Sequence, residues 1–161
     1  MTTRGSQLAA LTLLGALGLT AASGSRAVAP TALTGAWEVV ERSYQRGESS
    51  WVNSSPEAGR YVFTERYYGV QEIRESGPRP DFTDTTTELK RLAAFDVFHA
   101  HGGPYEIVGD RLVISIDIAK SPNTMSGDAT YEYQLEFSGD QVRVIRAVQG
   151  ERRTTTLRRM E

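Results

Sequence analysis

The chain has 161 residues, a formal net charge of −2 at pH 7 and no cysteine. This length fits one domain of ordinary size, and without disulfides its stability has to come from the hydrophobic core. The composition is weakly acidic and contains no long basic run. Nucleic acid is therefore not expected as a partner, because phosphate binding requires clustered Lys and Arg.

The N-terminal residues 1–29 are expected to be a secretory signal peptide. A positive charge at Arg4 precedes a short apolar run, residues 8–19, and small residues follow it. The run is too short to cross a hydrocarbon core of ~30 Å, and this order is typical of an export signal. Cleavage is expected between residues 22 and 29, which leaves a domain at 30–161 in the periplasm or outside the cell. No stable membrane anchor is expected, since no cysteine is present to carry a lipid.

The first half of this domain predicts three strands, at residues 35–44, 60–64 and 67–74. The polar, serine-rich residues 45–59 between the first two are expected to form a long loop. The prolines within residues 77–80 end the sheet there, because proline cannot donate to a strand ladder.

One helix is expected after these prolines. Thr85 and Glu88 have the spacing of a capping box, and apolar residues follow at three-residue steps up to Phe98. The pattern predicts a helix over residues 85–98 that covers the barrel, either at one mouth or on its outer wall.

The second half alternates strictly between apolar and polar residues. Leu112, Ile114, Ile116 and Ile118 share one face of a strand, which is typical of a half-buried position in a sheet. Further strands are expected at residues 105–108, 131–137, 142–144 and 152–160. Gly-Asp pairs at 109–110 and 139–140 indicate tight hairpins, because glycine accepts positive φ at no steric cost.

Together these elements predict an all-β fold. About eight strands in up-and-down order close into a small antiparallel barrel, with space inside for side chains or one small ligand. Closure also removes exposed strand edges. The single helix is expected between the third and fourth strands of this barrel.

The opening segment Leu33-Thr34-Gly35-Ala36-Trp37 resembles the Gly-x-Trp motif of lipocalins. Later segments look like the bacterial lipocalin-like domain family of the lipocalin/calycin superfamily: residues 103–110, 121–123, Gly127, 131–133 and 156–160. The resemblance spans most of residues 33–160, whereas the second and third motifs of the animal lipocalins are not recognisable. It implies a closed barrel end in which Trp37 packs against a basic side chain of the last strand, Arg159 or Arg158.

Tyrosines are numerous on the apolar faces of the predicted strands. A tyrosine offers an apolar wall with a polar tip, which suits a cavity for a small amphipathic molecule. The candidate ligand-binding residues are Tyr61, Tyr68, His99, Tyr105, Tyr131 and Tyr133. The same pattern also fits a filled core whose hydroxyls bind the backbone or water.

Three polar residues, Arg60, Glu72 and Arg74, interrupt otherwise apolar strands. We expect them on the outer surface, as arginine is usually exposed. An inward arginine would imply an internal glutamate or a bound anion, because an unpaired buried charge is costly.

The segment His99-Ala100-His101 is the sharpest chemical feature. Two histidines at i and i+2 of a strand point the same way and can share a metal, and Glu106 follows at a spacing that resembles the first metal motif of cupins. The chain has only two histidines, so a later histidine ligand is missing and no metal or other cofactor is predicted. The pair is instead expected at the exit of the helix, with one ring near a barrel mouth and the other in water.

Three functions remain open. The first is an exported binding protein that holds a small hydrophobic or amphipathic molecule. The second is a barrel enzyme, an isomerase or hydrolase of a lipid-like substrate, with His99 or His101 as acid–base. The third is a structural or interaction module with a filled barrel. We favour the first and assign no catalytic residue, because no cysteine, nucleophile elbow or phosphate-binding glycine motif is present. The sequence does not predict the oligomeric state.

Overall fold

The computed structural model describes residues 30–54, 56, 58–74, 81–83, 85–125 and 130–160. The predicted signal peptide, the proline break at 77–80 and Gly127 of the family resemblance lie outside these residues. The strands are β1 (Gly35–Arg46), β2 (Ser49–Asn53), β3 (Gly59–Phe63), β4 (Tyr67–Ile73), β5 (Phe98–Val108), β6 (Arg111–Ser115), β7 (Ile118–Ala119), β8 (Thr130–Ser138), β9 (Gln141–Val148) and β10 (Glu151–Arg159). The helices are a 3₁₀ turn η1 (Pro30–Ala32), α1 (Glu88–Asp96) and α2 (Pro122–Met125).

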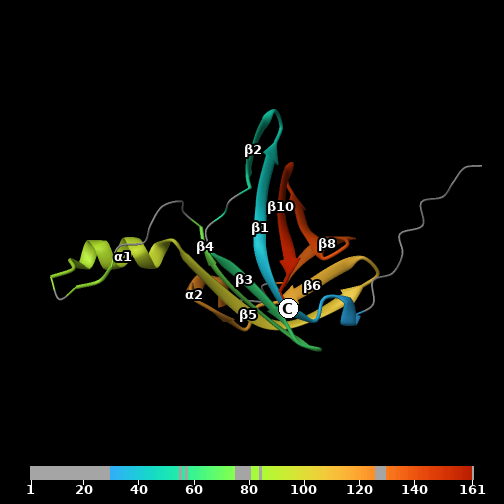
Figure 1. Ribbon diagram of the computed structural model, residues 1–161, viewed down its shortest axis with the longest axis horizontal. Helices are drawn as coiled ribbons and strands as arrows, with labels where there is room; N and C mark the ends of the chain where they lie inside the picture. Colours follow the sequence, from blue (N-terminus) through green and yellow to red (C-terminus); the bar gives the residue numbers. More distant parts are fainter. Residues whose placement is uncertain are drawn as a thin grey trace, which may run out of the picture.

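Eight of these strands form a closed antiparallel barrel (Figure 1). The order is β1-β3-β4-β5-β6-β8-β9-β10, and β10 pairs back with β1, with Trp37 opposite Arg159. Every neighbouring pair is antiparallel, so the predicted up-and-down barrel is confirmed. Helix α1 connects β4 to β5, the third and fourth strands of the ring, as expected.

The closed end of the barrel is built around Trp37, which is only 1% exposed. Its indole N–H donates to the carbonyl of Leu33 at 2.8 Å. The guanidinium of Arg159 lies 4.2 Å from the ring centroid and donates to the carbonyls of Thr34 and Ala32 at 2.7 and 2.6 Å. The contact implied by the family resemblance is therefore present, and Arg159 makes it.

The other candidate for this contact, Arg158, points outward, where it forms an ion pair with Glu38. Neighbouring residues of a strand face opposite sides of the sheet, so only one of the two arginines reaches the indole.

Strand β1 changes its inward face part-way along. Its register with β10 shifts between Val39 and Glu41, as at a β-bulge. Trp37 and Val39 face the core before the shift, whereas Arg42 and Tyr44 line the interior beyond it. The irregularity thus brings a charged side chain into the barrel.

The expectation of a loop over residues 45–59 is wrong. Gly47 has a φ of 55° and allows a tight turn, after which β2 pairs with the second half of β1. Tyr44 and Trp51 lie opposite each other, with ring centroids 6.2 Å apart. This hairpin extends beyond the closed ring and rises above it in Figure 1.

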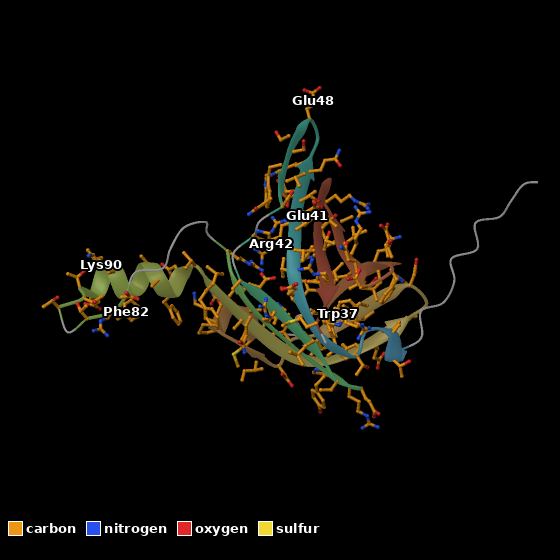
Figure 2. All side chains as sticks on the ribbon, viewed as in Figure 1. Trp37, Glu41, Arg42, Glu48, Phe82 and Lys90 are labelled. Carbon is orange, nitrogen blue, oxygen red and sulfur yellow. The ribbon has the colours of Figure 1, made fainter. Side chains whose placement is uncertain are left out.

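The expected role of the helix is also wrong. Helix α1 begins after Thr87, whose hydroxyl accepts from the Lys90 backbone N–H, so the predicted capping box does not form. Phe98, assigned by its spacing to the helix, is the first residue of β5. The helix therefore continues outward from the end of a strand, and it projects from the barrel instead of covering it (Figures 1 and 2). Among the described residues, none of the helices is both long enough and apolar enough to cross a bilayer.

A break after β6 alters the predicted strand at residues 111–118. The N–H of Asp117 donates to the carbonyl of Gly102 at 3.1 Å, and a Cβ on Gly103 would lie 2.0 Å from the carbonyl oxygen of Ser115. This close crossing of two backbones requires glycine at 103. Beyond the crossing Ile118 is exposed, and it does not share the inner face with Leu112.

Candidate functional site

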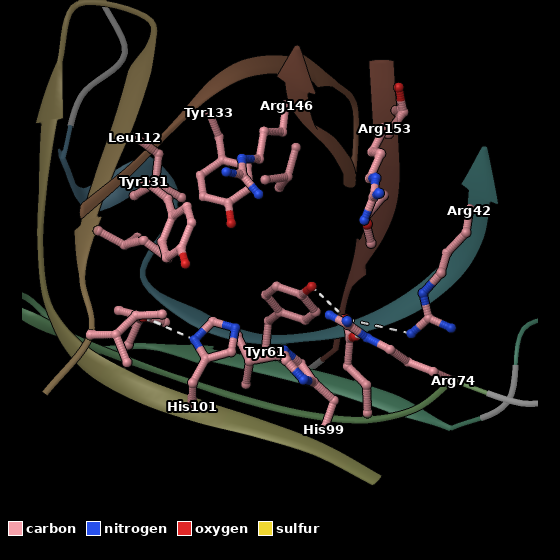
Figure 3. Close-up of a pocket in the computed structure, with 18 of the residues that line it drawn as sticks. Arg42, Tyr61, Arg74, His99, His101, Leu112, Tyr131, Tyr133, Arg146 and Arg153 are labelled. Carbon is pink, nitrogen blue, oxygen red and sulfur yellow. Dashed lines mark hydrogen bonds and ion pairs between the residues drawn. The ribbon is translucent and has the colours of Figure 1, made fainter. Parts of the chain in front are cut away.

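A cavity of about 570 Å³ lies inside the barrel (Figure 3), and Trp37 is not among the residues that line it. Its volume falls within the range of small-molecule pockets, about 300–1,000 Å³. Its apolar wall consists of Phe63, Val70, Leu112, Ile114, Ile116 and Val144. Tyrosines, histidines, arginines and one glutamate form the rest of the lining, so the cavity has apolar and polar regions.

Most of the predicted ligand-binding residues line this cavity: Tyr61, Tyr68, His99, Tyr131 and Tyr133. Tyr105 does not, and its assignment is wrong. Its hydroxyl donates to the carbonyl of Thr64 at 2.6 Å, and its ring meets Phe63 edge-on with centroids 5.4 Å apart. Tyr105 lies near the β3–β4 turn, at the closed end of the barrel, where it packs in the core.

Glu72 is the centre of a buried polar network. It is 3% exposed, and its position opposite Gly59 and His99 in the sheet directs it inward. Tyr61 donates to its Oε1 at 2.5 Å, Arg74 Nε donates to Oε2 at 3.0 Å, and Arg42 Nη2 lies 3.4 Å from Oε1. The expected outward placement is therefore wrong for Glu72, and Arg74 lines the cavity as well.

This network keeps Glu72 ionised. Burial raises the pKa of its carboxyl, but the Tyr61 hydrogen bond and the charges of Arg42 and Arg74 outweigh burial and hold the pKa below its ordinary value. Burial and the neighbouring carboxylate raise the pKa of Tyr61 well above its usual range. Tyr61 consequently remains a protonated donor. Arg60, in contrast, faces outward as expected and lies 3.9 Å from Glu38.

Both histidines lie on β5 and face the cavity, contrary to the expectation that one would lie in water. Their ring centroids are 5.1 Å apart, and the Tyr68 hydroxyl lies 2.9 Å from Nδ1 of His101. Burial lowers the pKa of His99. Burial and the neighbouring His99 lower the pKa of His101 to about 4. The cavity therefore holds two neutral imidazoles at pH 7.

Glu106 is exposed and does not join this pair. It is five residues from His101 on the same strand, and an odd spacing places side chains on opposite faces. In the part of the chain that the structure describes, no three His, Asp or Glu side chains gather as metal ligands.

The basic and aromatic residues at the mouth were not predicted from the sequence. Arg42, Tyr44, Trp51, Arg146 and Arg153 all line the cavity. The guanidinium of Arg146 lies 4.5 Å from the Tyr131 ring centroid, and that of Arg153 lies 5.7 Å from that of Tyr44. Arg146 continues the inward alternation of Val142 and Val144, which is a signal that the sequence does contain.

No protein-family model and no curated protein matches this chain. A solved structure of an uncharacterized protein from Bacteroides eggerthii DSM 20697 is similar, with a TM-score of 0.46 and 14% sequence identity. The match covers 80% of this chain and 99% of that chain. A similarity at this level carries no argument about function.

We expect the two half-buried histidines to make the protein less stable on mild acidification. An unfolded histidine binds a proton near its ordinary pKa of 6.5, whereas folded His101, with its lowered pKa, does so only near 4. The unfolded state therefore binds more protons between these values, and the free energy of unfolding falls as the pH falls through this window. Urea unfolding at pH 7, 6 and 5 measures the slope. His101→Asn should flatten it; an unchanged slope would contradict the assignment.

Proposed function

We propose that this protein is an exported, lipocalin-like binding protein that holds a small hydrophobic or amphipathic molecule inside its barrel. The observation that carries the proposal is the cavity of about 570 Å³. A barrel filled by its own side chains would not leave this volume, which argues against a purely structural module. Export and the family assignment rest on the sequence patterns at residues 1–29 and 33–160.

The lining of the cavity suits an amphipathic ligand. Branched aliphatic side chains such as Ile114 and Val144 supply apolar contacts. Within the described residues, the hydroxyls of Tyr131 and Tyr133 have no hydrogen-bond partner, and they are free to orient a polar group of the ligand.

A second candidate is an enzyme acting on a lipid-like substrate. It is favoured by the neutral rings of His99 and His101 in the cavity, because a neutral imidazole can accept a proton from a bound molecule. Turnover of a bound ester would favour this candidate, whereas release of the unchanged molecule favours the carrier.

Filling the cavity should weaken binding strongly. Val144 lies on the cavity wall and is largely buried, so Val144→Trp places an indole in the space proposed for the ligand. We expect the affinity for the neutral fluorescent probe N-phenyl-naphthylamine to fall by at least about tenfold, a loss of about 1.4 kcal/mol. Fluorescence titration measures it.

The matched control is Val62→Trp, because Val62 lies on the outer face of β3 and is 48% exposed. This variant should bind the probe like the parent protein. Equal affinities of both variants, with both melting as folded proteins, would place the probe outside the barrel and contradict the proposal.

A further inference from the structure

The charge around the cavity is opposite in sign to that of the whole protein. Four arginines line the cavity: Arg42, Arg74, Arg146 and Arg153. Glu72 is the one carboxylate among its described lining residues. The chain as a whole has a net charge of −2, so this local excess of positive charge is specific to the open end of the barrel.

Not all of this positive charge is neutralised within the described residues. Arg42 and Arg74 share Glu72, and Arg153 pairs with Glu151 at 2.9 Å. Arg146 contacts the Tyr131 ring and has no carboxylate within ion-pair distance among the described residues. Arg146 is partly exposed, so its guanidinium is accessible in the cavity, and a guanidinium without an acidic partner is a ready donor for a bound anion.

A second donor in the same region also lacks an acceptor. Nη2 of Arg42 is buried and has no hydrogen-bond partner in the described part of the chain. It lies 3.4 Å from Glu72 Oε1, beyond a good hydrogen bond. This nitrogen has almost no accessible surface, so a ligand in the cavity does not contact it, and Arg42 contributes its positive charge only.

Glu72 itself is not free to bind a cationic ligand. Its two oxygens already accept from Tyr61 and Arg74 and face Arg42. A positively charged head group would therefore meet two further arginines, Arg146 and Arg153, with no available carboxylate in the lining, which disfavours cations.

We propose that the ligand is an amphipathic molecule with a singly charged anionic head group of the carboxylate class. Arg146 holds the head group beside Tyr131 and Tyr133 (Figure 3). The apolar part packs against Ile114 and Val144. The planar guanidinium fork matches a carboxylate with two parallel N–H···O bonds. The tyrosine hydroxyls at the mouth supply further donors. This inference rests on the binding function proposed above and names its ligand class.

The test compares three molecules with straight chains of similar length and head groups of different charge: dodecanoate, dodecanol and dodecyltrimethylammonium. Each is titrated, below its micelle-forming concentration, against the complex with N-phenyl-naphthylamine, and displacement is followed by fluorescence. We expect dodecanoate to bind at least about tenfold more tightly than dodecanol, and the cation to bind most weakly.

Two substitutions of Arg146, on β9, test whether this residue binds the anionic head group. Arg146→Gln removes the inward guanidinium and should abolish most of the preference for dodecanoate, whereas Arg146→Lys should retain part of it. The matched control is Arg143→Gln on the outer face of the same strand, where Arg143 pairs with Glu136 at 2.8 Å. This control removes the same charge and should leave the preference unchanged.

Each outcome separates this inference from the binding function. Equal affinities for the three molecules, or a preference for the cation, would overturn the anionic ligand and leave a binding cavity. An equal loss of preference in Arg146→Gln and Arg143→Gln would overturn the site at Arg146. Failure of the probe and all three molecules to bind would overturn the proposed function as well. The comparison of head groups uses the unmodified protein, so it does not depend on whether a variant folds.

Discussion

Replacing Trp37 with alanine should lower the free energy of unfolding by about 3 to 5 kcal/mol. The indole fills the closed end of the barrel, where it is 1% exposed. Its removal leaves a cavity that rigid β-strands cannot close, and it also takes away the surface on which Arg159 lies. Urea unfolding, followed by far-ultraviolet circular dichroism, measures the loss.

The second tryptophan of the chain supplies the control. Trp51 lies on β2, outside the closed ring, and is 50% exposed. We expect Trp51→Ala to change the stability by less than about 1 kcal/mol. Similar losses in the two variants would mean that the closed end does not hold the barrel together.

Glu72→Gln should cost about 3 kcal/mol, the lower end of the range for breaking a buried ion pair. The variant keeps the size of the side chain and an acceptor for Tyr61, but it leaves the largely buried Arg42 without a counter-charge. Arg74 is exposed enough to turn toward water, which is why the lower end is expected. Denaturant unfolding at pH 7 measures the change.

The stability of the protein at low pH tests the role of the same carboxylate independently. The folded pKa of Glu72 is lowered below its ordinary value of 4.5, so its contribution is present above that value and is lost as the pH falls through the folded pKa. Glu72→Gln should therefore lose less stability than the parent protein on acidification below pH 4.5.

The control for this prediction is Glu132→Gln, which breaks an exposed pair with Arg111 at 3.0 Å. Exposed ion pairs contribute about 0–1 kcal/mol. If Glu132→Gln costs as much as Glu72→Gln, the interior network is not an important source of stability.

The ring of eight strands follows from patterns that a sequence displays directly. Alternation along residues 131–137 and the Gly-Asp turn at 139–140 specify two strands and their hairpin, because the side-chain period of a strand is two. Several such hairpins in succession leave few arrangements other than a closed sheet. The partner of Trp37 came from the family resemblance instead, since no local pattern links residue 37 to residue 159.

The side chains that line the mouth of the cavity were harder to predict than the strands, for the following physical reasons. Arg42 faces the interior of the barrel because the register of β1 shifts after Val39. No residue type in this segment indicates such an irregularity. The positions of the two histidines were predicted wrongly because the apolar spacing around Phe98 fits both a helix and a strand. The boundary between the two elements could therefore not be placed from the sequence. The inward position of Arg146 could have been predicted, because extending the alternation of β9 by two residues places this side chain inside the barrel.

The most direct measurement is a crystal structure of the protein with dodecanoate. We expect one molecule inside the barrel, with its carboxylate within hydrogen-bond distance of Arg146 and its alkyl chain against Ile114 and Val144. Density for the molecule on the outer surface, or an interior filled by the protein's own side chains, would contradict the proposed binding site.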